Sequence, residues 1–235
     1  MNVNSDYQQH VEISKQLKMS ESFHEARADS KESFEKIYNK AKEENINLTN
    51  AKDFLNSLSK DELSALQNHS LLVSEINVNS LNNEGAYNLL LHHYEKYDFD
   101  NDGLVSNGIS KGSTFLPTNM PNKEKEVLVQ TLNEMDEKDR FVSLLMLNPP
   151  KLVNIDGVIS AQNNDKYMDY EAIMERIDQI LNPPPLAYTS NELKTTFNIF
   201  KELFEKNFDK SIEQDEQNKS IRNRENQLSK AKLLA

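Results

Sequence analysis

Large apolar residues recur along most of this chain at intervals of three and four positions, a spacing that places them on one face of an α-helix. The segment that begins near Ser30 is a clear example. Its expected buried face carries Phe34, Ile37, Tyr38 and Ala41. Only 5 glycines occur in the 235 residues, so few positions interrupt such helices. The pattern predicts an all-α fold, an irregular bundle of about seven or eight helices with a long C-terminal helix.

Capping signals indicate where several helices begin. Ser59 and Glu62 have the spacing of a capping box, in which each side chain accepts a hydrogen bond from the other residue's backbone amide. Thr189 and Glu192 repeat this spacing before the last helix. Ser80 is the expected cap of the helix that leads into an acidic loop. We therefore expect these residues to mark the starts of three separate helices.

Changes in composition divide the chain into four parts. Residues 1–28 are polar with scattered apolar side chains, and we expect them to form a loose N-terminal arm or a poorly anchored helix. Residues 29–182 are expected to form the helical domain, with the acidic loop at 98–109. A proline spacer then leads into an amphipathic C-terminal helix at 183–212. Residues 213–235 have few large apolar side chains and are expected to form a polar helical or disordered tail.

Two stretches inside the expected domain lack helical spacing. Residues 103–120 contain several glycines and prolines, so we expect an irregular segment with a short strand around 113–116. Residues 151–166 are expected to form a long connection with a turn at Asp156-Gly157. Neither stretch is expected to contribute a helix.

The charge balance and the absence of cysteine exclude several classes of function. Acidic residues outnumber basic ones by 38 to 27, which gives a formal charge of −11. This argues against nucleic-acid binding, because phosphate contacts need clustered Lys and Arg, and it disfavours anionic membrane surfaces. Cations and basic partners are compatible with it. A chain with 0 cysteines has no disulfide, no thiolate metal site and no cysteine nucleophile.

The start of the chain lacks the features of a cleavable secretory signal. Residues 1–7 contain neither a basic region nor an apolar run. No stretch approaches the ~18–20 apolar residues of a membrane span. We therefore expect a cytoplasmic protein, with export by a route that needs no cleavable signal as the alternative.

The run Asp98-Phe99-Asp100-Asn101-Asp102-Gly103 has the residue types of a hard-metal site. Alternation along the chain turns Asp98, Asp100 and Asp102 toward one centre, and Gly103 permits the sharp turn that follows. Carboxylates packed this closely repel one another unless a cation lies among them. The sequence therefore predicts that these three carboxylates bind a divalent cation.

This run resembles the first half of the EF-hand calcium loop and the loop of dockerin-like repeats, over about a dozen residues. The resemblance implies Ca²⁺ as the ion, with Mg²⁺ as the alternative. It also implies the backbone carbonyl of Leu104 and the side chain of Ser106 as further ligands. Ile109 stands where the family has a bidentate glutamate, so we expect a dissociation constant of ~0.1–1 mM. The competing interpretation is an aspartate-rich turn that binds no metal.

The last helix has an apolar stripe that allows two interpretations. It includes Phe197, Phe200, Phe204 and Phe208. The stripe is typical of a helix that packs on the rest of a bundle. Because the helix follows a proline spacer and is long, the stripe is also compatible with a surface for a protein partner or for self-association.

No catalytic motif of the common metalloprotease, hydrolase or nucleotide-binding kinds occurs in the sequence. We therefore expect a non-enzymatic, soluble interaction or scaffold protein with one weak calcium-type site. One alternative is a helical adaptor or chaperone-like protein that holds its partner through the phenylalanine stripe. A third hypothesis is a hydrolase that uses a metal at the acidic loop.

Overall fold

The computed structural model describes residues 5–112, 116–147, 151–155, 158–162, 168–185 and 187–233, with the backbone alone for 151–155, 158–162 and 226–233. Its helices are α1 (Ser5–Ser14), α2 (Glu21–Glu25), α3 (Ala28–Glu43), α4 (Ala51–Ser57), α5 (Lys60–His69), α6 (Asn83–Leu89), α7 (Asn122–Glu134), α8 (Glu137–Leu147), α9 (Tyr170–Leu181) and α10 (Asn191–Leu233). A short 3-10 helix, η1, spans Val78–Ser80. The strands are β1 (Val105–Asn107), β2 (Ser110–Gly112), β3 (Lys151–Ile155) and β4 (Val158–Gln162).

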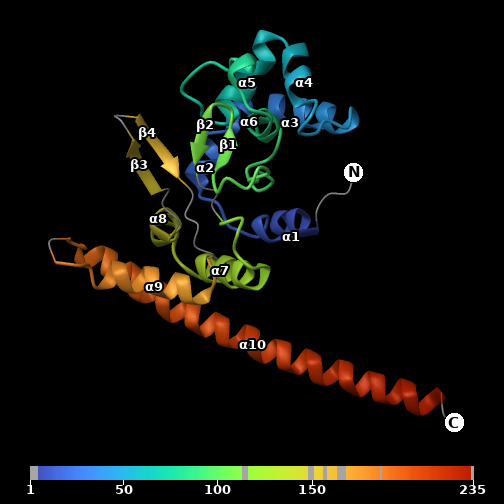
Figure 1. Cartoon of the computed structure of the whole chain (residues 1–235), viewed down its shortest axis with the longest axis vertical. Helices are drawn as coiled ribbons and strands as arrows, with labels where there is room; N and C mark the ends of the chain where they lie inside the picture. Colours follow the sequence, from blue (N-terminus) through green and yellow to red (C-terminus); the bar gives the residue numbers. More distant parts are fainter. Residues whose placement is uncertain are drawn as a thin grey trace.

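Helices dominate these ranges, and the strands form only two small antiparallel hairpins (Figure 1). The expected all-α class is confirmed. The described residues contain more helices than expected, because the N-terminal segment and several short stretches between the long helices are also helical. Among the helices described, none combines the length and the apolar content that crossing a bilayer requires.

The first hydrophobic core lies among α3, α4, α5 and α6. Its buried side chains include those expected for α3, which are Phe34, Ile37, Tyr38 and Ala41. Helix α3 ends where Asn45 adopts a φ of 55° and the amide of Ile46 donates to the carbonyl of Ala41 at 2.9 Å. That turn places Ile46 against the same core. Burial of each large side chain stabilises the fold by about 1.5–3 kcal/mol, more than the intrinsic helix preference of any single residue.

The second hydrophobic core contains side chains from α7, α9 and α10 and from the N-terminal segment. Fully or nearly fully buried members include Ile13, Leu132, Ile173, Ile177, Phe197 and Phe200. The proline spacer expected at 183–185 lies between α9 and α10, which pack side by side in this core (Figure 1). Helix α10 is therefore part of the helical body rather than a separate unit.

The expectation of a loose arm at 1–28 was wrong for the part of it that the structure describes. Residues 5–14 form α1, which packs on α7, and Ile13 and Leu17 are buried in the second core. The buried face has helical spacing but includes two polar residues, because His10 and Ser14 lie on it at 2% and 8% exposure. These polar residues hid the amphipathic pattern in the sequence.

The two hairpins were not expected. Strands β1 and β2 lie in the segment expected to be irregular, with Val105 opposite Gly112. Strands β3 and β4 replace the connection expected at 151–166 and pair in a continuous register. The expected turn at 156–157 lies outside the described residues, as do positions 113–115 of the strand expected around 113–116. Alternating apolar residues on both sides of an Asp-Gly pair are a recognised sequence signal for such a hairpin.

One of the three expected helix caps is confirmed. The Ser59–Glu62 capping box is complete at the start of α5. Helix α10 is capped by Ser190, whose hydroxyl accepts from the amide of Leu193 at 3.2 Å, rather than by Thr189. Helix α6 is capped by Asn82 rather than Ser80. An N-cap residue must be extended and lie immediately before the first helical residue, and the spacing rule alone does not fix that position.

Candidate metal centre

The acidic loop is held against the start of α6 by a close contact between two glycines. The amide of Gly108, in the turn between β1 and β2, donates to the carbonyl of Gly85 at 3.0 Å. A Cβ atom on Gly85 would lie 2.2 Å from the carbonyl oxygen of Gly108, a distance that real Cβ atoms do not show. Helix α6 and the β1–β2 hairpin can therefore approach this closely only because residue 85 has no side chain.

Asn88 joins the same elements through its amide group. Its Nδ2 donates to the carbonyl oxygens of Tyr97 at 3.0 Å and Ser106 at 2.8 Å, and its Oδ1 accepts from the amide of Tyr97 at 3.2 Å. The side chain is fully buried. Three of the four hydrogen bonds that an asparagine side chain can make are therefore formed. They fix both ends of the acidic loop relative to α6.

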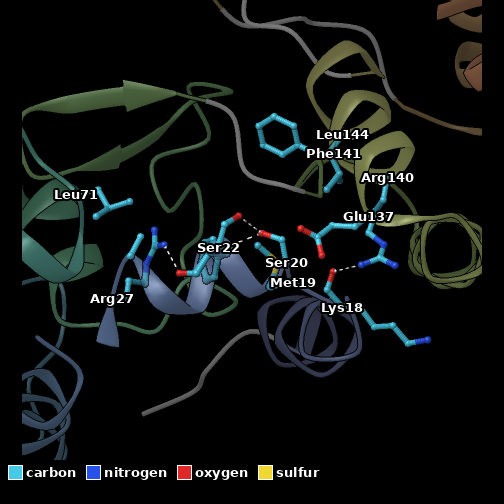
Figure 2. A pocket seen from close by; sticks show the side chains of 12 residues that line it. Lys18, Met19, Ser20, Ser22, Arg27, Leu71, Glu137, Arg140, Phe141 and Leu144 are labelled. Carbon is cyan, nitrogen blue, oxygen red and sulfur yellow. Dashed lines mark hydrogen bonds between the residues drawn. The ribbon is translucent and has the colours of Figure 1, made fainter. Parts of the chain in front are cut away.

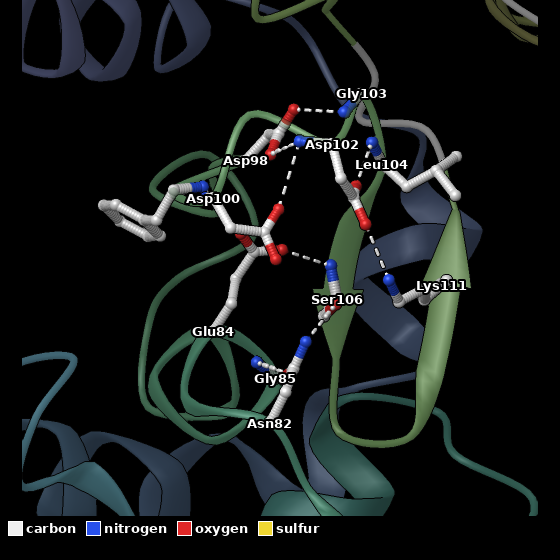
Figure 3. Close-up of polar contacts among 11 residues, drawn as sticks. Asn82, Glu84, Gly85, Asp98, Asp100, Asp102, Gly103, Leu104, Ser106 and Lys111 are labelled. Carbon is white, nitrogen blue, oxygen red and sulfur yellow. Dashed lines mark hydrogen bonds and ion pairs between the residues drawn. The ribbon is translucent and has the colours of Figure 1, made fainter. Parts of the chain in front are cut away.

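Within the loop, Asp98 accepts hydrogen bonds from the turn that follows it (Figure 3). Its two carboxylate oxygens accept from the amides of Asp102 at 3.1 Å and Gly103 at 2.8 Å. Gly103 has a φ of 86°, the left-handed region that glycine adopts without strain. The role expected for this glycine is therefore observed, and the turn directs the Asp98 side chain into the loop.

Glu84, in the first turn of α6, fills the loop from the opposite side. Its Oε2 accepts from the amides of Phe99 at 2.6 Å and Asp100 at 3.1 Å, and its Oε1 accepts from the amide of Ser106 at 2.6 Å. Only 4% of the residue is exposed. Glu84 thus binds three backbone amides that would otherwise be unpaired inside the loop.

Three carboxylates converge at this point, from Glu84, Asp98 and Asp100, each with an oxygen within 4.8 Å of the others (Figure 3). Two oxygens that each lie 2.3–2.6 Å from one Ca²⁺ can be at most about 5 Å apart. The spacing of the three oxygens therefore fits coordination of a single divalent cation. We call Glu84, Asp98 and Asp100 the acidic triad.

The electrostatics of the acidic triad favour a positive charge. Burial raises the pKa of Glu84, and the hydrogen bonds from Ser106, Asp100 and Phe99 only partly oppose that rise. Burial also raises the pKa of Asp98, and the neighbouring carboxylates of Asp102 and Asp100 raise it further. In both residues the ionised form is disfavoured, which is the condition that a bound cation reverses.

Asp102 lies outside the acidic triad, although the sequence predicts it as a ligand. Its carboxylate accepts from the amide of Leu104 at 2.9 Å and from Nζ of Lys111 on β2 at 2.6 Å. Hydrogen bonding to Asp102 raises the pKa of Lys111, which favours the charged form of the lysine. Lys111 already supplies the counter-charge that a metal would give, and Figure 3 shows the Asp102 side chain directed toward it.

Ser106 supports Glu84. Its amide binds Glu84, its hydroxyl accepts from Nδ2 of Asn82 at 3.1 Å, and its carbonyl accepts from Asn88. A ligand role for Ser106, and for the carbonyl of Leu104, stays a prediction. Ile109, at the position where the family has glutamate, is 56% exposed.

The elements around the loop differ from those of an EF-hand. Helix α6 ends at Leu89, well before Asp98, and the loop leads into strand β1 rather than into a helix. The carboxylate contributed from outside the aspartate run comes from Glu84, upstream of it, instead of from the end of the loop. Any likeness to the family is therefore confined to the aspartate run itself.

Glu84 was missed in the sequence because its position suggests a different role. An acidic residue in the first turn of a helix is common, since it interacts favourably with the helix dipole. The contact with the loop depends on the approach of α6 to β1, which no local pattern encodes. The one available signal was Gly85, since glycine within a helix indicates a close backbone contact.

The phenylalanine stripe is covered by the chain itself. Phe197, Phe200 and Phe204 are fully buried in the second core. Phe208 is partly buried and stacks on Tyr170 of α9, with ring centroids 4.1 Å apart. These contacts are those of the bundle-packing interpretation.

Comparison of the chain with protein-family models, with curated proteins and with solved structures found no match. The function must therefore be inferred from the geometry of the chain.

Proposed function

We propose that this chain is a non-enzymatic interaction or scaffold protein whose fold is stabilised by one calcium-type ion bound to the acidic triad. The observation that supports this proposal is the convergence of three carboxylate oxygens within 4.8 Å, two of them from residues that are only 4% exposed. Two of the three carboxylates, those of Glu84 and Asp98, are buried, and a buried carboxylate beside other carboxylates is costly unless a cation compensates it.

The proposed role of the ion is structural. Glu84 comes from α6, whereas Asp98 and Asp100 come from the acidic loop, so one ion would join the two segments. Ca²⁺ is favoured over Mg²⁺, because it accepts irregular oxygen geometry and carboxylates that already accept other hydrogen bonds. With three protein carboxylates and a partly open site, we expect a dissociation constant of ~0.1–1 mM.

Thermal unfolding with and without calcium tests this proposal. The protein is first dialysed against a chelator and then melted in buffer, in 10 mM CaCl₂ and in 10 mM MgCl₂. A ligand present at 100 times its dissociation constant stabilises the folded state by about 2.7 kcal/mol. For a chain of this size, that corresponds to a rise of several degrees in melting temperature. A melting curve that calcium leaves unchanged would contradict the proposal.

A second candidate function is that of an adaptor which binds its partner through the C-terminal helix. The observation that favours it is the extent of α10, which continues beyond the helical body (Figure 1), with residues 212–225 exposed. Removing residues 213–235 and measuring molar mass by light scattering tests self-association. If the full chain and the truncated chain are both monomers and bind the same partners, the adaptor function does not reside in this extension.

A further inference from the structure

An apolar pocket of about 260 Å³ lies between α2 and α8, and none of the acidic triad lines it (Figure 2). Met19, Phe23, Leu71, Phe141 and Leu144 contribute to its wall. Phe141 is 55% exposed. The pocket is large enough for one bulky apolar side chain and is open to solvent.

The three basic residues of this apolar pocket, Lys18, Arg27 and Arg140, all donate hydrogen bonds within the protein. Nζ of Lys18 donates to the carbonyl of Asn133 at 3.5 Å. The guanidinium of Arg140 donates to the carbonyls of Leu132, Lys18 and Met135. The guanidinium of Arg27 donates to the carbonyl of Phe23 and lies over the Phe23 ring, with Cζ 3.6 Å from the ring centroid. Both arginine side chains therefore form walls of the pocket.

A second pocket, of about 690 Å³, adjoins the first and shares Ala26 and Leu71 with it. Its wall is polar and acidic, with Asp29 from the first turn of α3 and Asp61 from the first turn of α5. In the part of the chain that the structure describes, neither carboxylate has a hydrogen-bond or ion-pair partner. The two pockets thus form one continuous surface, apolar at one end and negative at the other.

Leu71 stands between the two pockets in a backbone conformation that does not suit it. It follows Ser70, the C-cap residue of α5, and has a φ of 54°. Its amide donates to the carbonyl of Asn68 at 3.1 Å, and the amide of Leu72 donates to the carbonyl of Gln67 at 3.0 Å. Glycine is the usual residue there, because a Cβ atom is strained in the left-handed region.

Burial does not compensate that strain, since Leu71 is 51% exposed. Val73, two residues further on and also at the second pocket, is fully exposed. A side chain that costs folding free energy and packs little within its own chain indicates a contact outside it.

We propose that these two pockets bind a short segment of a partner protein in which a large apolar side chain lies next to Lys or Arg. The apolar side chain occupies the pocket beside Phe141, and Leu71 packs on its flank. The basic side chain pairs with Asp29 and Asp61. The formal charge of −11 on the whole chain further favours a basic partner over an acidic one. This proposal specifies the partner of the scaffold function and does not depend on the metal.

Selection from a displayed library of random ten-residue peptides on the immobilised full-length chain tests the proposal. We expect the selected sequences to combine Leu, Ile, Phe or Met with a nearby Lys or Arg. Binding of the best peptide, synthesised with a fluorescent label, is then measured by anisotropy. Leu71→Gly and the double variant Asp29→Asn, Asp61→Asn should each weaken it at least tenfold. Asp53→Asn, which changes an exposed first-turn aspartate of α4 away from both pockets, should not.

The Leu71→Gly variant also separates a binding role from a folding role. Glycine relieves the backbone strain, so its melting temperature should equal or exceed that of the unchanged chain by a few degrees while peptide binding is lost. A lower melting temperature would overturn the argument from Leu71. Selected peptides without the apolar–basic pair, or peptides that bind Leu71→Gly equally well, would overturn the proposal. Peptide binding is measured both in chelator and in calcium. Loss of peptide binding would contradict the pocket proposal, whereas the calcium-dependent melting curves test the metal site separately.

Discussion

Glu84 has two opposing effects on the acidic loop. As an acceptor for the amides of Phe99, Asp100 and Ser106, it orders the backbone of the loop. As a buried carboxylate beside two others, it adds like charge, and its pKa is raised by burial as a result. A bound cation removes the second effect and leaves the first, so Glu84 is the residue on which the metal proposal depends most.

The distinction between Asp100 and Asp102 gives a prediction at the scale of single residues. Asp100→Asn removes a charge of the acidic triad and should abolish most of the rise in melting temperature caused by calcium. Asp102→Asn removes a carboxylate that is paired with Lys111 and should leave most of that rise in place. Melting curves of both variants with and without 10 mM CaCl₂ check this. Equal loss in the two variants would show that all three aspartates are ligands.

His10 gives a prediction about pH. Burial, together with the nearby charge of Lys125, lowers its pKa to about 3, and its Nδ1 has no partner in the described part of the chain. The folded state therefore takes up this proton only at much lower pH than the unfolded state, whose histidine titrates near its ordinary value. The contribution of neutral His10 to the free energy of unfolding is fully present above about pH 6.5, and it declines as the pH falls toward the pKa of His10 in the folded state. Between pH 7 and 5 the decline due to His10 alone is about 2 kcal/mol.

This contribution of His10 is measured by denaturant unfolding of the unchanged chain and of His10→Leu, each at pH 7 and at pH 5. The other titrating groups are common to both proteins, so their contributions cancel in the comparison. The unchanged chain should lose about 2 kcal/mol more than the variant over this range. Equal losses would mean that His10 is protonated in the folded state.

At the scale of secondary-structure elements, the contact between α6 and the β1–β2 hairpin controls the geometry of the metal site. Gly85→Ala places a Cβ atom against the carbonyl of Gly108 and should force the two elements apart, with a loss of about 1–3 kcal/mol of stability. The response to calcium should fall with it. Gly112→Ala is a matched control, because a Cβ atom there meets no atom of the described residues within 4 Å. Melting curves in which the two variants behave alike would contradict this role of Gly85.

An element could be predicted from the sequence where residues close together in the chain determine it. Helix α3 and its buried face followed from apolar spacing, which is a short-range signal. Helix α1 was missed because two polar residues occupy its buried face. In the metal site, Asp98 and Asp100 could be identified from their spacing. Glu84 could not, since its place in the acidic triad results from a contact between segments distant in sequence.

At the scale of the whole molecule, the two hydrophobic cores divide the chain differently from its composition. The first core is built from residues between Phe34 and Leu90, whereas the second combines α1 with α7, α9 and α10. The N-terminal segment thus contributes to the core that also holds the C-terminal helix. Composition suggested an arm and a separate C-terminal helix, because it reports how polar a segment is and not which surface covers its few apolar residues.

Direct measurement of calcium binding by calorimetric titration of the chelator-treated protein tests the central claim. The account predicts one site per chain with a dissociation constant of ~0.1–1 mM in the unchanged protein and in Glu43→Gln, an exposed glutamate on α3. It predicts binding at least tenfold weaker in Glu84→Gln. No binding heat in the unchanged protein, or equal affinity in Glu84→Gln, would contradict it.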